Sequence, residues 1–153
     1  MKTVTLPIQK PVARVGSGVV YCPESGEILL LQRKIGPEVN RWTFPGGKVE
    51  FGERTVMAMV RELEEETGLC VDEYMLDMIG FLDHIEFGTH FSGPVYLVTL
   101  TKEVIDSARN VEPEKHQAIG LFSLRDLSPD LMLTYPAKVA LACLSIHLAK
   151  EAQ

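Results

Sequence analysis

The order of the expected strands and helices is the feature that most constrains the fold of this chain. Strand patterns are found in six segments: residues 12–21, 27–33, 41–44, 69–84, 95–100 and 119–124. Helical patterns are found in two, residues 55–67 and 134–150. Because these strands do not alternate strictly with helices, we expect an α+β sandwich built on a mixed central β-sheet.

Turn signals separate the expected elements. Residues 23–26 (Pro-Glu-Ser-Gly) lie between the first two strands, which should therefore pair as a hairpin. Residues 45–47 (Pro-Gly-Gly) predict a sharp turn, and residues 86–93 a loop. Gly68 follows the first helix in the position of a left-handed C-cap, and Gly80 predicts a bulge. In the absence of repeats and linker-like segments, residues 1–153 are expected to form a single domain.

Composition and charge restrict the classes of partner. The chain has 15 Lys and Arg against 21 Asp and Glu, a net charge of −6, which disfavours generic binding to nucleic acid or to a membrane surface. Its three cysteines form no CxxC pair, as is typical of a reduced intracellular protein. We recognise neither a signal peptide nor a membrane span. We therefore expect a cytoplasmic monomer or homodimer that acts on a small molecule.

The helix over residues 55–67 carries a cluster of carboxylates. Glu62, Glu65 and Glu66 share one side of a helical wheel. The expected core-facing stripe consists of Val56, Val60, Leu63 and Thr67. Like charges at i,i+4 destabilise a helix by about 0.2–0.5 kcal/mol per pair. The cluster is therefore either a solvated face or a site for a hard cation such as Mg²⁺ or Mn²⁺, close to a backbone carbonyl of the Pro-Gly-Gly turn.

The spacing of residues 47–69 favours the cation site. Gly47 is followed after five residues by Glu53, after seven more by Arg61-Glu62-Leu63, and then by Glu65-Glu66 and Gly68-Leu69. This pattern matches G-x5-E-x7-R-E-U-x-E-E-x-G-U, where U is aliphatic, and it resembles the box of the Nudix hydrolases. The resemblance implies an α/β/α sandwich and hydrolysis of a diphosphate linkage in a nucleoside diphosphate joined to a further group.

The resemblance also implies roles for the residues of the box. Those expected to hold Mg²⁺ or Mn²⁺ are Glu62, Glu65, Glu66 and the carbonyl of Gly46. Arg61 and Glu53 are expected to orient these carboxylates. For the base that activates the attacking water, Glu62 is preferred to Glu66, although several relatives place the base on a loop outside the box.

Residues outside the box resemble MutT-type nucleoside triphosphate diphosphatases. The similar segments are residues 14–19, 30–34, 45–53 and 110–116, the last containing Glu-Pro-Glu-Lys. The resemblance implies that Arg33 and Lys48 contact phosphate. Four aromatic residues either line a base pocket or belong to the core, namely Trp42, Phe44, Phe91 and Tyr96. The expected reaction converts a nucleoside triphosphate, normal or oxidised, to a monophosphate and pyrophosphate.

Departures from this subgroup leave the base preference open. Gln117 stands where the subgroup often has a glutamate, and Ile119 and Leu121 stand where tryptophans are common. ADP-ribose or a nucleotide sugar is the alternative substrate, and a non-catalytic nucleotide sensor is a remote alternative. The histidines show no metal-ligand spacing, but His90 and His116, in or near loops, could approach a substrate.

Overall fold

The computed structural model describes residues 10 and 12–153. The strands in this part of the chain are β1 (Val12–Cys22), β2 (Glu27–Arg33), β3 (Trp42–Thr43), β4 (Gly46–Lys48), β5 (Leu76–Glu86), β6 (Thr89–Thr99) and β7 (His116–Ser123). The helices are α1 (Thr55–Thr67), α2 (Lys102–Asp106) and α3 (Tyr135–Glu151), and a 3-10 turn, η1 (Glu73–Met75), precedes β5. None of the helices in the described ranges combines the length and apolarity that crossing a membrane requires.

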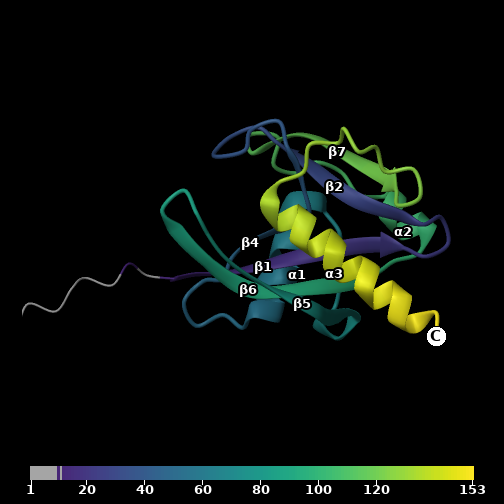
Figure 1. Cartoon of the computed structure of the whole chain (residues 1–153), viewed down its shortest axis with the longest axis horizontal. Helices are drawn as coiled ribbons and strands as arrows, with labels where there is room; N and C mark the ends of the chain where they lie inside the picture. The colour runs from purple at the N-terminus through teal and green to yellow at the C-terminus, as the bar shows by residue number, and fades with distance from the viewer. Residues whose placement is uncertain (1–9, 11) are drawn as a thin grey trace, which may run out of the picture.

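The strands form one mixed sheet (Figure 1). Its main order is β3-β2-β1-β6-β5, with β4 also paired to β1 and β7 to β2. β1 runs parallel to β6, and the other pairings are antiparallel. The expected α+β architecture with a mixed sheet is therefore confirmed, as is the hairpin of the first two strands.

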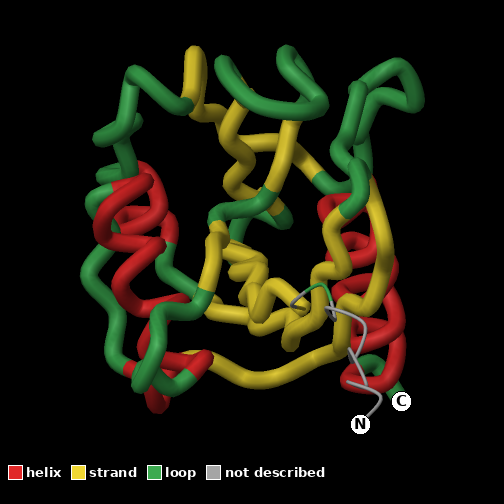
Figure 2. The backbone as a smooth tube through the Cα atoms, turned by 90° about the vertical axis from the view of Figure 1, so that its left-hand side faces the viewer, coloured by secondary structure: helices red, strands yellow, loops and turns green. Residues whose placement is uncertain are grey.

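Helices cover both faces of the sheet, which Figure 2 shows as yellow strands between red helices. Successive residues of β1 point to opposite faces, so Val19 and Val20 enter different cores. Val19 packs in the cluster that includes Ala140 and Leu144 of α3. Val20 packs in the cluster that includes Leu63 of α1. The molecule is thus an α/β/α sandwich, and β1 supports the inner surface of both helical layers.

The expected helix over residues 55–67 is confirmed at both ends. Gly68 adopts a left-handed φ of 72°, and its N–H donates to the carbonyl of Glu64, which closes the last turn. Leu63 is fully buried, and Val56 and Val60 are partly buried against the same core. The reading of the acidic side as a solvated face is wrong for Glu62 and Glu66, because both residues are buried.

Two of the expected irregular segments are regular in the structure. The Pro-Gly-Gly segment was expected to be a turn, but Gly46–Lys48 forms β4, which pairs with Val15, Gly16 and Ser17 of β1. Two adjacent glycines allow this strand to lie close to the glycine-containing part of β1. At Gly46 an added Cβ would overlap the carbonyl of Gly16, so the close pairing depends on the missing side chain.

The loop expected over residues 86–93 is instead the tip of the β5–β6 hairpin. Phe87 and Gly88 form the turn, with φ of 49° and 73°, and β6 begins at Thr89. Positive φ at both central residues matches the twist of a two-residue hairpin. β5 begins at Leu76, later than expected, and its register shifts between Met78 and Gly80, which confirms the bulge. The short helix α2 had no recognised sequence signal.

Candidate active site

The close packing of α1 on β4 places two carboxylates against glycine backbone. The N–H of Gly46 donates to Oε2 of Glu66 at 3.0 Å. The carboxylate of Glu62 lies against Gly47, where an added Cβ would overlap its oxygen atoms. A residue with a side chain at position 47 would therefore separate β4 from the acidic side of α1.

Arg61 organises the remaining carboxylates of this helix. Its Nε and Nη2 donate to Glu53 at 2.9 and 3.1 Å, and its Nη1 donates to Glu62 at 3.0 Å and to Glu65 at 3.1 Å. Nη2 also donates to the carbonyl of Lys48 at 3.2 Å, which ties α1 to the end of β4. One planar guanidinium thus fixes the directions of three carboxylates.

In the absence of a cation, burial raises the pKa of both buried glutamates, Glu62 and Glu66. It raises the pKa of Glu66 to about 8; the charges of Glu62 and Glu112 add to this shift, whereas the Gly46 N–H opposes it. Burial also raises the pKa of Glu62, although Arg61 lowers it. Hydrogen bonding to Arg61 lowers the pKa of the partly buried Glu53 carboxyl. The site therefore holds excess negative charge where solvation is weak.

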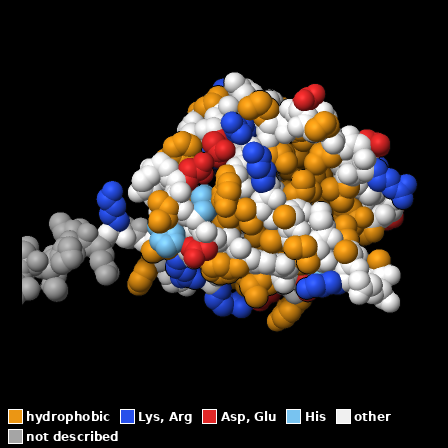
Figure 3. Space-filling view, in the orientation of Figure 1, with side chains coloured by type: hydrophobic (Ala, Val, Ile, Leu, Met, Phe, Trp, Pro, Cys, Tyr) orange, Lys and Arg blue, Asp and Glu red, His pale blue; other side chains and the backbone are white. Residues whose placement is uncertain are grey.

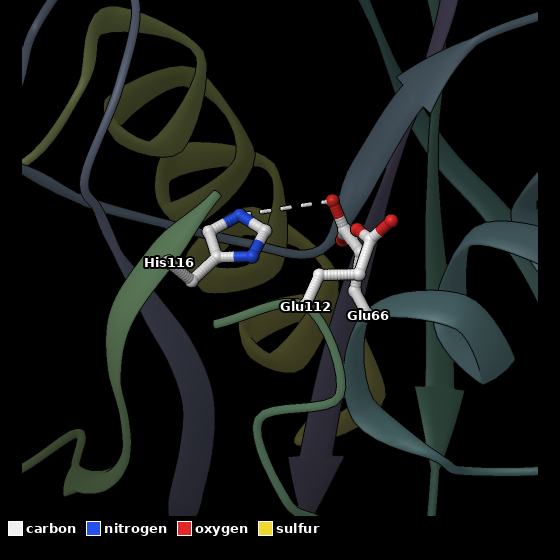
Figure 4. A group of neighbouring side chains, drawn as sticks. All are labelled: Glu66, Glu112 and His116. Carbon is white, nitrogen blue, oxygen red and sulfur yellow. Dashed lines mark ion pairs between the residues drawn. The ribbon is translucent and has the colours of Figure 1, made fainter. Parts of the chain in front are cut away.

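A loop far along the chain adds two further groups to this site. Glu112, before β7, and His116, its first residue, each place a potential ligand atom within 4.8 Å of the corresponding atom of Glu66. Figure 4 shows the three side chains directed toward one another, with Nε2 of His116 3.8 Å from Oε1 of Glu66. Lys115 holds Oε1 of Glu112 at 2.7 Å. Oε2 of Glu112 and Nδ1 of His116 are buried and lack a hydrogen-bond partner within the described ranges.

A cavity of about 550 Å³ opens beside this group. Its lining includes Glu66, Gly46 and His116, together with three predicted substrate-binding residues: Arg33, Lys48 and Phe44. The β5–β6 hairpin supplies Leu82, His84, Glu86, Phe87, Thr89 and Phe91. Figure 3 shows acidic, basic and histidine side chains gathered at the left of the face, where Figure 1 has the hairpin and the start of α3. The cavity therefore joins a charged region to an aromatic one.

Not every candidate residue reaches this cavity. Phe91 lines it, but Trp42 packs edge-on against Phe122 at 4.8 Å, and Tyr96 belongs to the core beneath α1. Among the described lining residues there is no Glu53, Arg61, Glu62 or Glu65. The last three lie on α1, and Glu53 precedes this helix. His90 pairs with Asp83 at 2.6 Å on the hairpin.

Sequence reasoning missed Glu112 and His116 as partners of Glu66. His116 had been considered only as a residue near substrate, and Glu112 only as part of the Glu-Pro-Glu-Lys segment. That segment was the one available signal, because spacing along the chain does not connect residue 66 with residue 112. No functional signal was recognised for His84, at the end of the expected strand, or for Glu86, at the start of the expected loop.

The residues around Glu66 fit a hard divalent cation. Carboxylate oxygens are the ligands that Mg²⁺ and Mn²⁺ prefer. The unpartnered Oε2 of Glu112 and the raised pKa of Glu66 both indicate negative charge that lacks compensation and that a cation would neutralise. The acidic group needs positive charge, and the adjoining cavity leaves space for it.

Comparison with known sequences gives one family and several named relatives. The chain matches the NUDIX domain over residues 12–142. It is 41% identical over 54 residues to the 8-oxo-dGTP diphosphatase of Escherichia coli (strain K12), covering 35% of this chain and 42% of that protein. It is 40% identical over 68 residues to the m7GpppN-mRNA hydrolase NUDT17 of Xenopus laevis, covering 43% and 23%. The matches thus span less than half of these two relatives.

Solved structures extend the similarity to nearly the whole chain. The crystal structure of a MutT NUDIX hydrolase from Burkholderia pseudomallei has a TM-score of 0.76 and 34% sequence identity, covering 88% of this chain and 99% of that one. A C. elegans Ap4A hydrolase has a TM-score of 0.70 and 26% identity, covering 91% and 99%. The family match spans residues 12–142. It therefore includes Glu66, which accepts from the N–H of Gly46, and Arg61, which donates to Glu53. The chain belongs to the NUDIX family.

Proposed function

We propose that this protein hydrolyses a nucleoside triphosphate, normal or oxidised, to a nucleoside monophosphate and pyrophosphate, and that the reaction depends on Mg²⁺ or Mn²⁺. Family membership and the MutT-type relatives support diphosphate chemistry. The observation that carries the proposal is the cavity that joins buried Glu66 to Arg33, Lys48 and the aromatic residues of the hairpin. A nucleoside triphosphate needs charged groups for its phosphates and apolar surface for its base, and the cavity contains both.

The side chains divide into three proposed groups. Those that hold the cation are Glu62, Glu65, Glu66 and the carbonyl of Gly46, joined by Glu112 and His116 beside Glu66. Arg61 and Glu53 keep the carboxylates oriented through the hydrogen bonds at 2.9–3.1 Å. Arg33 and Lys48 contribute positive charge to the cavity and bind phosphate oxygens, while Phe44 packs under the substrate.

When bound, the cation would neutralise the diphosphate and acidify a water molecule. The residues of the chain have the remaining tasks. Glu62 accepts the proton of the attacking water, with Glu66 as the second candidate for this role. Arg33 and Lys48 stabilise negative charge on the leaving pyrophosphate. Because Arg61 restricts Glu62, the base is held in one orientation before the substrate arrives.

Product-resolved hydrolysis tests the proposal. The panel contains normal and oxidised deoxynucleoside triphosphates, ADP-ribose, nucleotide sugars and dinucleoside polyphosphates, each with Mg²⁺ and with Mn²⁺. We expect pyrophosphate and a monophosphate from a triphosphate, lost in Glu62→Gln and Glu66→Gln but retained in Glu64→Gln, an exposed neighbour on α1. Full activity in both site variants would refute the assigned residues.

The same panel separates the alternatives. Faster hydrolysis of ADP-ribose or a nucleotide sugar than of any triphosphate would keep the cation site and reject the triphosphate assignment. Tight nucleotide binding without turnover with either cation would indicate a sensor. The cytoplasmic location, the lack of nucleic-acid or membrane partners, and the monomeric or homodimeric state remain predictions.

A further inference from the structure

The β5–β6 hairpin contributes an ordered polar pair to the cavity. Nε2 of His84 lies 3.3 Å from Oε2 of Glu86, and both residues line the cavity. They are two positions apart on β5, so their side chains lie on the same face of the strand. His84 stacks on Phe91, which lines the same cavity, and neither His84 nor Glu86 belongs to the group of Glu66, Glu112 and His116.

His84 is held in place by aromatic packing. Its ring stacks on Phe91 with centroids 5.3 Å apart and an interplanar angle of 23°, and it contacts Tyr135 of α3 at 4.9 Å. Only 8% of its side chain is exposed. Its Nδ1 is buried and has no hydrogen-bond partner among residues 10 and 12–153. Such a fixed imidazole restricts the position of the Glu86 carboxylate that it contacts.

The chemistry of a carboxylate determines which bases it can bind. An ionised carboxylate accepts hydrogen bonds and donates none. A guanine-type base has a ring N–H beside an exocyclic amino group, so two adjacent donors can meet the two carboxylate oxygens. Adenine and cytosine have a ring acceptor beside their amino group, and thymine has carbonyl oxygens on both sides of its ring N–H. Each of those acceptors would face a negative charge.

We propose that Glu86, positioned by His84, reads the base of the substrate and selects purines with a guanine-type donor edge. This inference rests on the proposed function, since it takes the cavity as the nucleotide site. Phe91 and Phe87 supply apolar surface for the base in the same region. The Glu86 side chain is 27% exposed, and a bound base would cover it. A base without a donor edge would then leave the covered carboxylate unpaired, which discriminates against that base by a large factor.

The test compares kcat/KM for dGTP with that for dATP in the full chain with Mg²⁺. We expect the wild type to prefer dGTP by roughly 100-fold or more. Glu86→Gln replaces one acceptor with a donor of the same shape, so the preference should fall about tenfold or more through loss of dGTP activity, with dATP activity maintained. His84→Phe keeps the aromatic packing but releases Glu86, and it should lower the preference to a smaller extent.

Asp83→Asn provides a matched control. Asp83 also pairs with a histidine of the hairpin, His90 at 2.6 Å, but it is absent from the described lining of the cavity. Its substitution should leave the ratio unchanged. A ratio that moves equally in both variants would assign the effect to hairpin stability and overturn the proposal, as would a wild type without preference. Thermal melting of each variant confirms folding.

Calorimetric binding of GMP and AMP separates this inference from the proposed function. If triphosphates are not hydrolysed but GMP binds more tightly than AMP in a Glu86-dependent manner, the proposed reaction fails and the base-reading role stands. If triphosphates are hydrolysed and neither the kinetic ratio nor GMP binding responds to Glu86→Gln, the base-reading role alone is refuted. Loss of both hydrolysis and selective binding refutes both.

Discussion

Removing the charge of Glu66 should stabilise the cation-free protein, and the effect should grow with pH. The folded chain raises the pKa of Glu66 to about 8, from an ordinary value near 4.5. The folded state therefore binds this proton more tightly than the unfolded state does, so its stability is greatest below the ordinary pKa and decreases as pH rises through 8. At 1.36 kcal/mol per pKa unit, the full penalty is about 5 kcal/mol.

Glu66→Gln removes this penalty while its amide oxygen can still accept from the N–H of Gly46. Between pH 6.5 and pH 9, the stability difference between variant and wild type should grow by about 2 kcal/mol in favour of the variant. Burial lowers the pKa of His116 from its ordinary value of 6.5, so protonation of His116 in the unfolded state destabilises the fold as pH falls through that value. Wild type and variant share this effect, so it cancels in their difference. Urea unfolding with EDTA at several pH values gives the difference directly.

The exposed Glu64→Gln variant controls for the loss of one negative charge from α1. Its stability relative to wild type should change little over the same range. A Glu66→Gln difference that stays constant with pH, or a variant less stable than wild type at pH 9, would refute the assignment of the charge penalty to Glu66. Added Mg²⁺ should flatten the wild-type pH dependence, because a bound cation favours the ionised carboxylate.

Three further changes test the packing and the network of the site. Gly47→Ala introduces a methyl group against the carboxylate of Glu62, so the rate of hydrolysis should fall about 100-fold or more. Circular dichroism should show that the variant is folded. A fully active variant would mean that β4 and α1 can move apart without loss of function. Arg61→Ala removes the hydrogen bonds that hold three carboxylates, so the affinity for Mn²⁺ should fall about 10–100-fold. Electron paramagnetic resonance measures this affinity, and an unchanged value would contradict the positioning role of Arg61. Leu63→Ala leaves a cavity in the core beneath α1 and should cost about 2–5 kcal/mol in urea unfolding, whereas a cost under about 1 kcal/mol would show that the core collapses around it.

The local parts of the site could be predicted from the sequence because their determinants are close together in the chain. Helical periodicity and Gly68 define α1, and the spacing of residues 47–69 identifies the glutamates and Arg61. The observed hydrogen bonds from Arg61 to Glu53, Glu62 and Glu65 involve residues within eight positions of it. Such contacts follow from helix geometry and one short connection.

The remaining parts depend on tertiary packing. Glu112 and His116 meet Glu66 because the loop before β7 is hydrogen-bonded to the end of α1, through the N–H of Val111 and the carbonyl of Glu66, and because β7 pairs with β2. No local pattern specifies either contact. Burial of Glu62 and Glu66 depends on the approach of β4, whose two glycines were interpreted as a turn because both roles favour glycine. The aromatic residues of the hairpin were missed for a related reason. Residues 86–93 were interpreted as a loop, whereas Phe87 and Gly88 form a tight hairpin turn.

The two edges of β1 carry different parts of the cavity. One edge pairs with β4, which supports the glutamates, and the other pairs with β6, which carries the hairpin at the cavity. The tip of the β5–β6 hairpin, with Phe87 and Gly88 in its turn, lies beyond the part of β6 that packs against Leu63 of α1 through Val98. Substitutions near this tip should therefore disturb α1 and β4 little. The side chains that face a bound molecule from the hairpin can therefore change while the positions of the glutamates on α1 stay the same.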